Sequence, residues 1–147
     1  MKKILSIMYL IALLPWSYAS AQQSQEFGEF EIHYSALNSS FLTPEVATAY
    51  GIRRSSSRAL INISVLKSGE AELPVAVSAT VVASGRNLTG QTRNVEMREI
   101  DQGDGAIYYI GELSVRNMEM FDFTVLVTPQ GTTEPLKVKF RQQFYTE

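Results

Sequence analysis

The sequence predicts an all-β protein, an immunoglobulin-like β-sandwich of about seven strands with one short connector helix. Three observations lead to this prediction. Apolar and polar residues alternate through most of the chain beyond residue 22, which is the period of a half-buried strand. Turn-forming residues separate these runs at the spacing that sandwiches have. Only one segment carries the marks of a helix. A small closed barrel is the alternative architecture.

The first 21 residues are expected to be a signal peptide and not part of the fold. Lys2 and Lys3 give a positive start, residues 4–14 are apolar, and residues 19–21 (Ala-Ser-Ala) form a small-x-small cleavage site. The apolar run is shorter than the roughly 20 residues of a membrane span. We therefore expect cleavage after Ala21, a single mature domain of residues 22–147, and export to the periplasm without stable membrane insertion.

Composition limits the partners of this domain. The chain has no cysteine, so the exported domain has to be stable without disulfides, and lipid attachment at an N-terminal cysteine is excluded. The 13 basic residues less Lys2 and Lys3 leave 11, against 15 acidic ones, so the mature domain has a net charge of −4. This charge argues against nucleic acid as a partner.

The mature chain is expected to begin with a polar, frayed lead-in over residues 22–26. A first strand follows, because Phe30, Ile32, Tyr34 and Ala36 alternate with polar residues. Residues 38–40 (Asn-Ser-Ser) end this strand.

The helix is predicted over two turns between Thr43 and Gly51. Thr43 suits the N-cap, Pro44 the first helical position, and Glu45 the positive end of the helix dipole. Val46, Ala47 and Tyr50 share one side, and Gly51 is suited to a left-handed C-cap.

The remaining strands are predicted from the same alternation, with turns at residues 68–69, 85–87, 101–105 and 129–131. Their expected ranges are 59–66, 75–84, 92–100, 106–113, 121–127 and 136–141. In the last strand, Leu136, Val138 and Phe140 are expected to point inward. Lys137, Lys139 and Arg141 are then on the outer face.

A set of short motifs lies in the first third of the mature chain. They are Phe27-Gly28, Ile32-His33-Tyr34, Phe41-Leu42-Thr43-Pro44-Glu45-Val46-Ala47, Tyr50-Gly51-Ile52, Arg54-Ser55 and Asn62-Ile63. With these motifs the chain resembles a family of small exported proteins of Gram-negative bacteria, known as domain of unknown function 4426. The resemblance extends over the whole mature chain. It implies an immunoglobulin-like β-sandwich and brings no established activity, cofactor or catalytic residue.

The chain offers little for catalysis or metal binding. His33 is the only histidine, and no Gly-x-Ser-x-Gly nucleophile elbow is present, although a Ser–His pair stays open. One histidine and no cysteine are a poor ligand set for zinc. Asp101 and Asp104 could serve calcium, but they are equally the residues of an ordinary hairpin loop. We predict a protein that is not an enzyme and has no metal or cofactor.

Two neighbouring segments supply the candidate binding residues. Arg53, Arg54 and Arg58 lie among serines, where they could bind a phosphate or carboxylate, or form a solvated loop that pairs with glutamates such as Glu45. Phe41, Leu42, Tyr50 and Ile52 either close one end of the sandwich as an apolar plug, which we favour, or form an aromatic pocket beside Arg54 and His33. The candidate binding residues are His33, Tyr34, Tyr50, Arg53, Arg54 and Ser55.

The outer face of the last strand has two interpretations. Lys137, Lys139 and Arg141 could face an anionic partner, such as lipopolysaccharide phosphates or an acidic protein surface. They are also the usual protection of an exposed edge strand against pairing with other chains, which we favour.

Together these observations predict a non-enzymatic, periplasmic protein-interaction module of the cell envelope. Its partner would be another envelope protein, bound at an edge strand or at the loop around the short helix. The alternative is a small-molecule or anion binder with a pocket near that helix. A hydrolase that uses His33 is the least favoured possibility.

Overall fold

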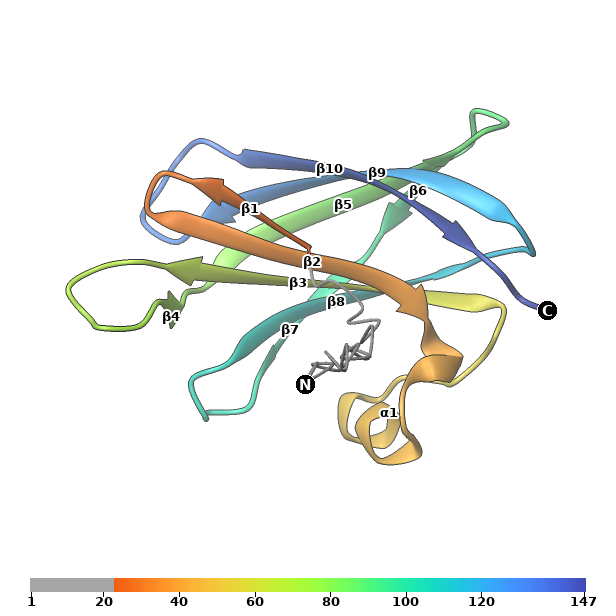
Figure 1. Ribbon diagram of the computed structural model, residues 1–147, viewed down its shortest axis with the longest axis horizontal. Coiled ribbons are helices and arrows are strands. Elements are labelled where there is room, and N and C mark those ends of the chain that lie inside the picture. The colour runs from red at the N-terminus through yellow and green to blue at the C-terminus, as the bar shows by residue number, and fades with distance from the viewer. Residues whose placement is uncertain (1–22) are drawn as a thin grey trace, which may run out of the picture.

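The protein is a sandwich of two antiparallel β-sheets with one short α-helix outside them, as the computed structural model describes for residues 23–147 (Figure 1). This arrangement confirms the predicted fold class. The predicted signal peptide lies outside the described residues. Within residues 23–147, no helix has the length and apolar character that crossing a bilayer requires.

The two sheets are here called sheet A and sheet B. Sheet A has the order β1-β2-β3-β8-β7, and its sixth strand, β4, pairs with β3; sheet B has the order β10-β9-β5-β6. The strands of sheet A are β1 (Gln23–Phe27), β2 (Phe30–Asn38), β3 (Arg58–Lys67), β4 (Val75–Ala76), β7 (Met97–Asp101) and β8 (Ile107–Ser114). Those of sheet B are β5 (Ala79–Asn87), β6 (Thr92–Val95), β9 (Glu119–Pro129) and β10 (Leu136–Phe144).

The core lies between the inner faces of the two sheets. Alternation along β3 buries Ile61, Ile63 and Val65, as the sequence predicts, and β9 contributes the fully buried rings of Phe121 and Phe123. Further aromatic contacts link the layers, since Tyr34 of β2 stacks on Phe140 of β10 and Phe140 on Phe123. A disulfide-free domain of this size therefore depends on a continuous apolar layer for its stability.

Two predicted strands are in fact four, and with the additional strand β1 the described residues form ten strands instead of about seven. The 75–84 segment divides into β4 in sheet A and β5 in sheet B, and β5 continues through the predicted turn to Asn87. The 92–100 segment divides at Glu96, with β6 in sheet B and β7 in sheet A. Apolar alternation cannot reveal such a crossing, because a strand that changes sheets keeps burying residues on both sides of the break.

The crossing at Glu96 requires the glycine beside it. Gly111 of β8 lies opposite Met97, and a Cβ atom at residue 111 would be 2.5 Å from both Met97 Sδ and Val95 Cγ1. Such distances are far below van der Waals contact, so a side chain here would push β6 and β7 off the sandwich.

The prediction of a frayed lead-in is wrong for the described residues 23–26. These residues form edge strand β1, which pairs antiparallel with β2 from Gln23 opposite Tyr34 to Phe27 opposite Phe30. The turn contains Gly28 at a φ of 59°, a conformation that favours glycine. A polar sequence suffices for this strand because it is an exposed edge with one partner only.

The helix forms as its sequence predicts. In α1 (Pro44–Tyr50), Thr43 Oγ1 accepts a hydrogen bond from Val46 N at 3.3 Å, and Gly51 closes the C-terminus at a φ of 65°. A 3-10 turn, η1 (Ser39–Phe41), precedes it. Of the three residues expected on one side, Ala47 is buried, Tyr50 is half-buried and Val46 is exposed.

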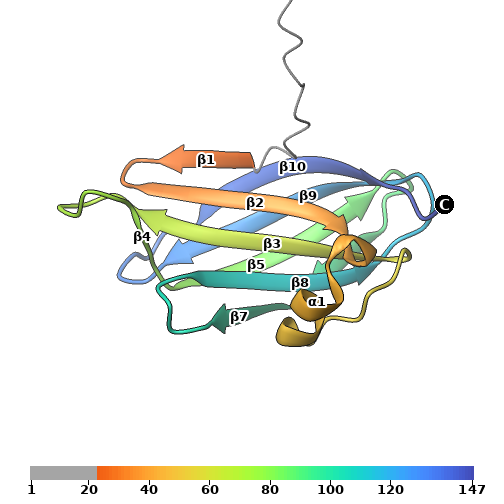
Figure 2. The ribbon, with the colours of Figure 1, turned by 60° about the horizontal axis from the view of Figure 1, so that its bottom comes forward.

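The helix covers an outer sheet face, which corrects the prediction that it plugs an end of the sandwich. In the ribbon, α1 lies beside β3 and β8 of sheet A (Figure 2). Ala47 of α1 and the following Ile52 pack with Leu60 of β3 and Ile110 of β8, two outward-pointing residues of sheet A. Arg98 Nη2 of β7 donates to Tyr50 O at the C-terminal end of the helix. Without the helix, Leu60 and Ile110 would be exposed to water on the outer face of sheet A, and α1 buries them.

Candidate functional site

The part of the outer face of sheet A that lies away from α1 is open. The pairing of β2 with β3 places Ser64 opposite His33 and Leu66 opposite Glu31. Ser64 and Leu66 lie on the same face of β3 as Leu60, because side chains of a strand alternate between its two faces, and His33 and Glu31 of β2 lie next to them on that face. The helix covers Leu60 but reaches none of this second group, whose members remain half-buried.

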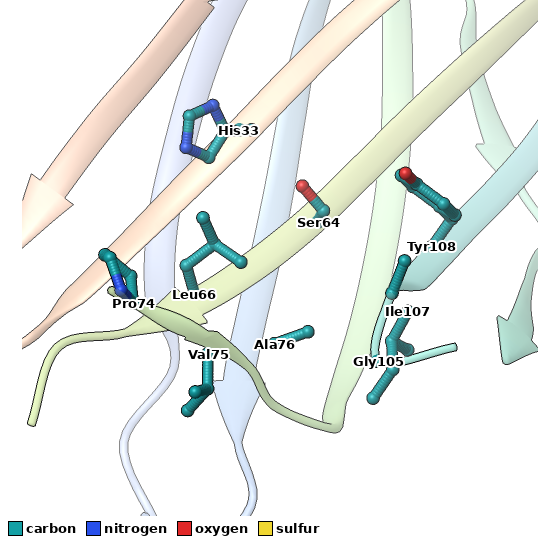
Figure 3. Close-up of a pocket in the computed structure, with 10 residues that line it drawn as sticks. His33, Ser64, Leu66, Pro74, Val75, Ala76, Gly105, Ile107 and Tyr108 are labelled. Atoms are coloured by element: carbon teal, nitrogen blue, oxygen red, sulfur yellow. The ribbon is translucent and has the colours of Figure 1, made fainter. Parts of the chain in front are cut away.

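A groove of about 500 Å³ lies on this open part (Figure 3). Volumes of this order are typical of sites that hold a small ligand or a large side chain. Its lining is mainly apolar, with three polar side chains: His33, Ser64, Leu66, Pro74, Val75, Ala76, Gly105, Ala106, Ile107 and Tyr108. The groove, here called the outer groove, is the candidate functional site.

The outer groove exists because two strands separate. The pairing of β3 with β8 ends at Ile63 opposite Tyr109, whereas β4 pairs with β3 at Leu66 and Lys67. Between these contacts the walls are the chain that leads into β4 and the start of β8 (Figure 3). The groove thus lies at the opposite end of sheet A from α1 (Figure 2).

His33 and Ser64 face the same side of the sheet without forming a nucleophile–base pair. His33 Nε2 is 3.2 Å from Glu31 Oε1 on its own strand. Among the hydrogen bonds of residues 23–147, none joins the imidazole to Ser64 Oγ. A general base needs its nucleophile within hydrogen-bond reach, so this arrangement gives the groove polar contact points and no activated serine.

The hairpin loop beside the groove is held by its own aspartates. Asp101 Oδ1 accepts from Gly103 N at 2.9 Å, and Asp104 Oδ1 accepts from Ala106 N at 3.0 Å. These are the turn-stabilising bonds that aspartate commonly makes. No group of three or more histidine or acidic side chains in the described part of the chain is arranged to hold a metal ion.

Tyr109 fixes β8 where its neighbour Tyr108 lines the groove. The Tyr109 hydroxyl accepts from Ala79 N of sheet B at 2.8 Å and donates to Glu99 Oε2 of β7 at 2.8 Å. Burial disfavours the phenolate and raises the pKa of Tyr109 above its usual value, and the hydrogen bond to Glu99 acts in the same direction. This hydroxyl therefore joins both sheets under the groove.

The predicted binding residues do not come together at one place. His33 lines the outer groove, but its chain neighbour Tyr34 points to the core and stacks on Phe140 with 4.8 Å between ring centroids. Tyr50 lies on α1 and packs with the residues under the helix. Neither Tyr50 nor the Arg53–Ser55 segment belongs to the lining of the outer groove.

The arginine-rich loop is anchored from below by a buried serine. Ser39 Oγ is 2.9 Å from Arg53 O and accepts from Ser55 N at 2.9 Å. Arg54 Nη2 donates to Ser40 O at 3.2 Å, while Arg53 is exposed. The expected glutamate partner is also different, because Arg58 Nε lies 3.5 Å from Glu112 Oε1 and not beside Glu45.

The basic stripe lies on an edge strand, in agreement with the favoured interpretation. β10 is the first strand of sheet B, and its Lys137, Lys139 and Arg141 are exposed. Arg141 forms a two-point ion pair with Asp122 of β9, with distances of 2.6 and 2.9 Å. This pair lowers the pKa of the Asp122 carboxyl. Lys137 and Lys139 are left as the exposed cations of the stripe.

Sequence reasoning missed most of the outer groove. Ser64, Leu66 and Tyr108 lie in predicted strands, and alternation places Ser64 and Leu66 on the outer face. The periodicity does not reveal which strands pair, however. It therefore could not predict that Ser64 and Leu66 lie close to Tyr108 and Val75.

Comparisons with known proteins add a family and a fold. A family model described as "Domain of unknown function (DUF4426)" matches residues 24–147. A crystal structure of a DUF4426 family protein from Pseudomonas aeruginosa is 32% identical to this chain, with a TM-score of 0.74. That match covers 88% of this chain and 99% of the other. No curated protein matches.

More distant structures share the fold alone. FetP of uropathogenic Escherichia coli, recombinantly expressed in the periplasm of E. coli, is 10% identical over 84% of this chain and 93% of its own, with a TM-score of 0.59. A copper-bound variant of FetP is 11% identical over 84% and 90%, with a TM-score of 0.56. At such identities nothing about copper carries over to the residues of this chain.

Proposed function

The chain belongs to the DUF4426 family, and from this premise we propose that it is a non-enzymatic, periplasmic protein-interaction module of the bacterial cell envelope. The outer groove is its proposed docking site. The family brings no activity with it, so the proposal depends on the geometry of the site.

The observation that carries the proposal is an apolar groove that the protein's own helix leaves open. The outward-pointing Leu60 and Ile110 of sheet A are covered by α1, whereas Leu66, Ala76 and Ile107 line a groove of about 500 Å³. Val75 of the lining is 51% exposed, and Leu73, which precedes the lining residue Pro74, is 74% exposed. A concave apolar surface that is accessible to solvent is characteristic of binding sites.

The periplasmic location is supported by the leader-like residues 1–21 and by the fold that the chain shares with FetP, a protein expressed in the periplasm. N-terminal sequencing of protein purified from the periplasmic fraction tests it. We expect a mature N-terminus at Gln22. Intact Met1 on cytoplasmic material would contradict the location.

Photo-crosslinking in living cells tests the docking site. A photoreactive phenylalanine analogue replaces Val75 at the outer groove or, as the matched control, Val82 on the outer face of sheet B, which is 58% exposed. We expect a discrete crosslinked product from position 75 and none from position 82. Filling the groove by Ala106→Trp should remove that product. Equal products from both positions, or none from either, would count against the proposal.

The alternative, an anion binder at the arginine-rich loop, has less support. Arg53 is exposed there and Ser55 lies next to Arg54, but Arg54 Nη2 already donates to Ser40 O. A thermal-shift screen with phosphate, sulfate and carboxylates separates the two possibilities, because a specific ligand raises the melting temperature by mass action. A rise that Arg53→Ala abolishes would favour the anion binder.

A hydrolase built on His33 has the least support. His33 Nε2 lies beside Glu31, and a serine on the neighbouring strand is the only candidate nucleophile of the groove lining. Any hydrolytic activity found in purified protein should therefore persist in His33→Ala. Loss of that activity in His33→Ala with unchanged folding would revive the hydrolase.

A further inference from the structure

The two loops that border the outer groove carry only acidic charges. Glu70 and Glu72 lie in the 68–74 segment that leads into β4, and Asp101 and Asp104 lie at the β7–β8 hairpin. Neither 68–76 nor 101–110 contains a lysine or an arginine. All four carboxylate-bearing residues are exposed, and Asp104 directly precedes the lining residues Gly105 and Ala106.

The floor adds no compensating positive charge. His33 is the basic residue of the groove lining, and its Nε2 lies 3.2 Å from Glu31 Oε1. The nearest basic side chain in sequence, Lys67, lies 3.7 Å from Glu29 Oε1. The groove therefore combines apolar walls with a negative rim. An occupant that is apolar at its centre and positive at its borders is complementary to it.

The position of the carboxylates decides between a simple amine and a peptide. Val75 and Gly105 line opposite walls of the groove (Figure 3). Glu70 and Glu72 lie in the segment before Val75, and Asp101 and Asp104 lie in the hairpin before Gly105. An occupant that meets both walls needs cations on both sides of its apolar anchor. An extended peptide with an apolar residue between lysines or arginines supplies this pattern, whereas a simple amine has one charge. The volume of about 500 Å³ accommodates a large side chain.

We propose that the outer groove binds an extended basic segment of a partner protein, with an apolar side chain in the groove and flanking lysines or arginines at the acidic loops. This inference rests on the proposed function and specifies the chemistry of the partner. The acidic loops would also speed the encounter with a basic segment and make it sensitive to salt.

Three blocked peptides of equal length test the charge requirement. Each carries a central phenylalanine, flanked by two lysines, two glutamines or two glutamates. They are titrated into the isotope-labelled protein while amide resonances of Ala76, Ile107 and Tyr108 at the groove are followed, with Val82 of sheet B as the reference. We expect the lysine peptide to bind about tenfold more tightly than the glutamine peptide, and the glutamate peptide to bind more weakly still. Raising the salt concentration should reduce these differences.

A matched pair of double variants locates the charges. Glu72→Gln with Asp104→Asn removes one carboxylate from each wall, and asparagine retains the oxygen that accepts from Ala106 N. We expect this variant to bind the lysine and glutamine peptides equally. Glu45→Gln with Glu147→Gln removes the same charge from exposed residues outside the groove and should keep the tenfold preference.

The outcomes separate this inference from the proposed function. Equal binding of all three peptides at Tyr108 would overturn the charge requirement and leave the groove as a docking site. Absence of binding by every peptide, with the crosslink from position 75 intact, would overturn the basic segment alone. Absence of both would overturn both proposals. Phe41 is 77% exposed, and Arg54 Nη2 donates to the carbonyl oxygen of the preceding Ser40, so this chain also carries an exposed apolar side chain next to a residue bound by an arginine. Self-association in sedimentation that Phe41→Ser abolishes would identify the occupant as a second copy and overturn the foreign basic segment.

Discussion

The outer face of sheet A has a covered half and an open half, built from the same strands. In the covered half, Leu60 and Ile110 are each 3% exposed under Ala47 and Ile52. In the open half, four and six residues further along β3, Ser64 and Leu66 line a groove with Tyr108. One half is stabilised by the protein's own helix, and the other keeps its apolar surface accessible.

Stability and binding are assigned to different halves of this face. A side chain buried under α1 contributes its full transfer free energy to folding. A side chain at the groove contributes only part of its transfer free energy to folding. The remaining part contributes to binding when an occupant covers the side chain. The same substitution should therefore have different effects in the two halves.

The largest expected effect is in the covered half. Leu60→Ala should lower the free energy of unfolding by about 3 kcal/mol, because it leaves a cavity under the helix. Leu66→Ala, the same change on the same face of the same strand, should cost about 1 kcal/mol or less because Leu66 is only half-buried. Urea unfolding followed by circular dichroism measures both. Equal losses would erase the distinction between the halves.

The next effect concerns the hydroxyl beneath the open half. Tyr109→Phe should cost about 2 kcal/mol, because Ala79 N and Glu99 lose their hydrogen-bond partner. Because burial raises the pKa of Tyr109, the folded protein retains the phenol proton after the unfolded chain has lost it.

The contribution of Tyr109 titration to stability is therefore complete below about pH 10 and declines as the pH rises through the raised value. Unfolding free energies from about pH 8 to about pH 11 should fall more steeply for the wild type than for Tyr109→Phe. The difference between the two proteins isolates Tyr109 from the other tyrosines. Parallel curves would show that the hydroxyl is not desolvated.

A smaller effect is expected at the helix that covers the face. Thr43→Ala removes the acceptor for Val46 N and should cost about 1 kcal/mol. Thr43→Ser keeps an acceptor and should cost much less. Hydrogen exchange at the Ala47 amide should quicken in the alanine variant. An unchanged rate and stability would indicate that packing on Leu60 and Ile110 holds α1 without its cap.

The smallest effect on stability is expected in the open half. Val75→Ser should change the free energy of unfolding by no more than about 0.5 kcal/mol, because half of the side chain is exposed. The same variant should nevertheless weaken binding of the lysine peptide, as measured by isothermal titration. If Val75→Ser lowered the stability but left peptide binding unchanged, the open half would serve folding and not binding.

The sequence predicted the sandwich and the helix because their signals are local. Alternation placed Ile61, Ile63 and Val65 in the core, and the cap residues Thr43 and Gly51 set the ends of α1. The strand count was too low for a physical reason. The change of sheet at Glu96 requires that Gly111 of β8 has no side chain, because Val95 and Met97 pack against it. This contact joins strands whose pairing is not encoded in a local sequence pattern.

The candidate site was less accessible to sequence reasoning. His33 was singled out as the only histidine, and it does line the outer groove. Tyr34, also a candidate binding residue, points to the core and stacks on Phe140, because successive strand residues point to opposite faces. The groove itself arises from the separation of β3 and β8, and no local pattern encodes where two distant strands part.

The passage of the chain from β6 to β7 through Glu96 has a consequence for how the molecule comes apart. β6 is the last strand of sheet B and β7 the last of sheet A, and a single residue joins them. The two sheets are therefore covalently connected by one residue at this edge, and local unfolding of β6 or β7 should disturb both sheets. Slow amide exchange in β6, β7 and β8 should accordingly report one cooperative opening shared by both layers.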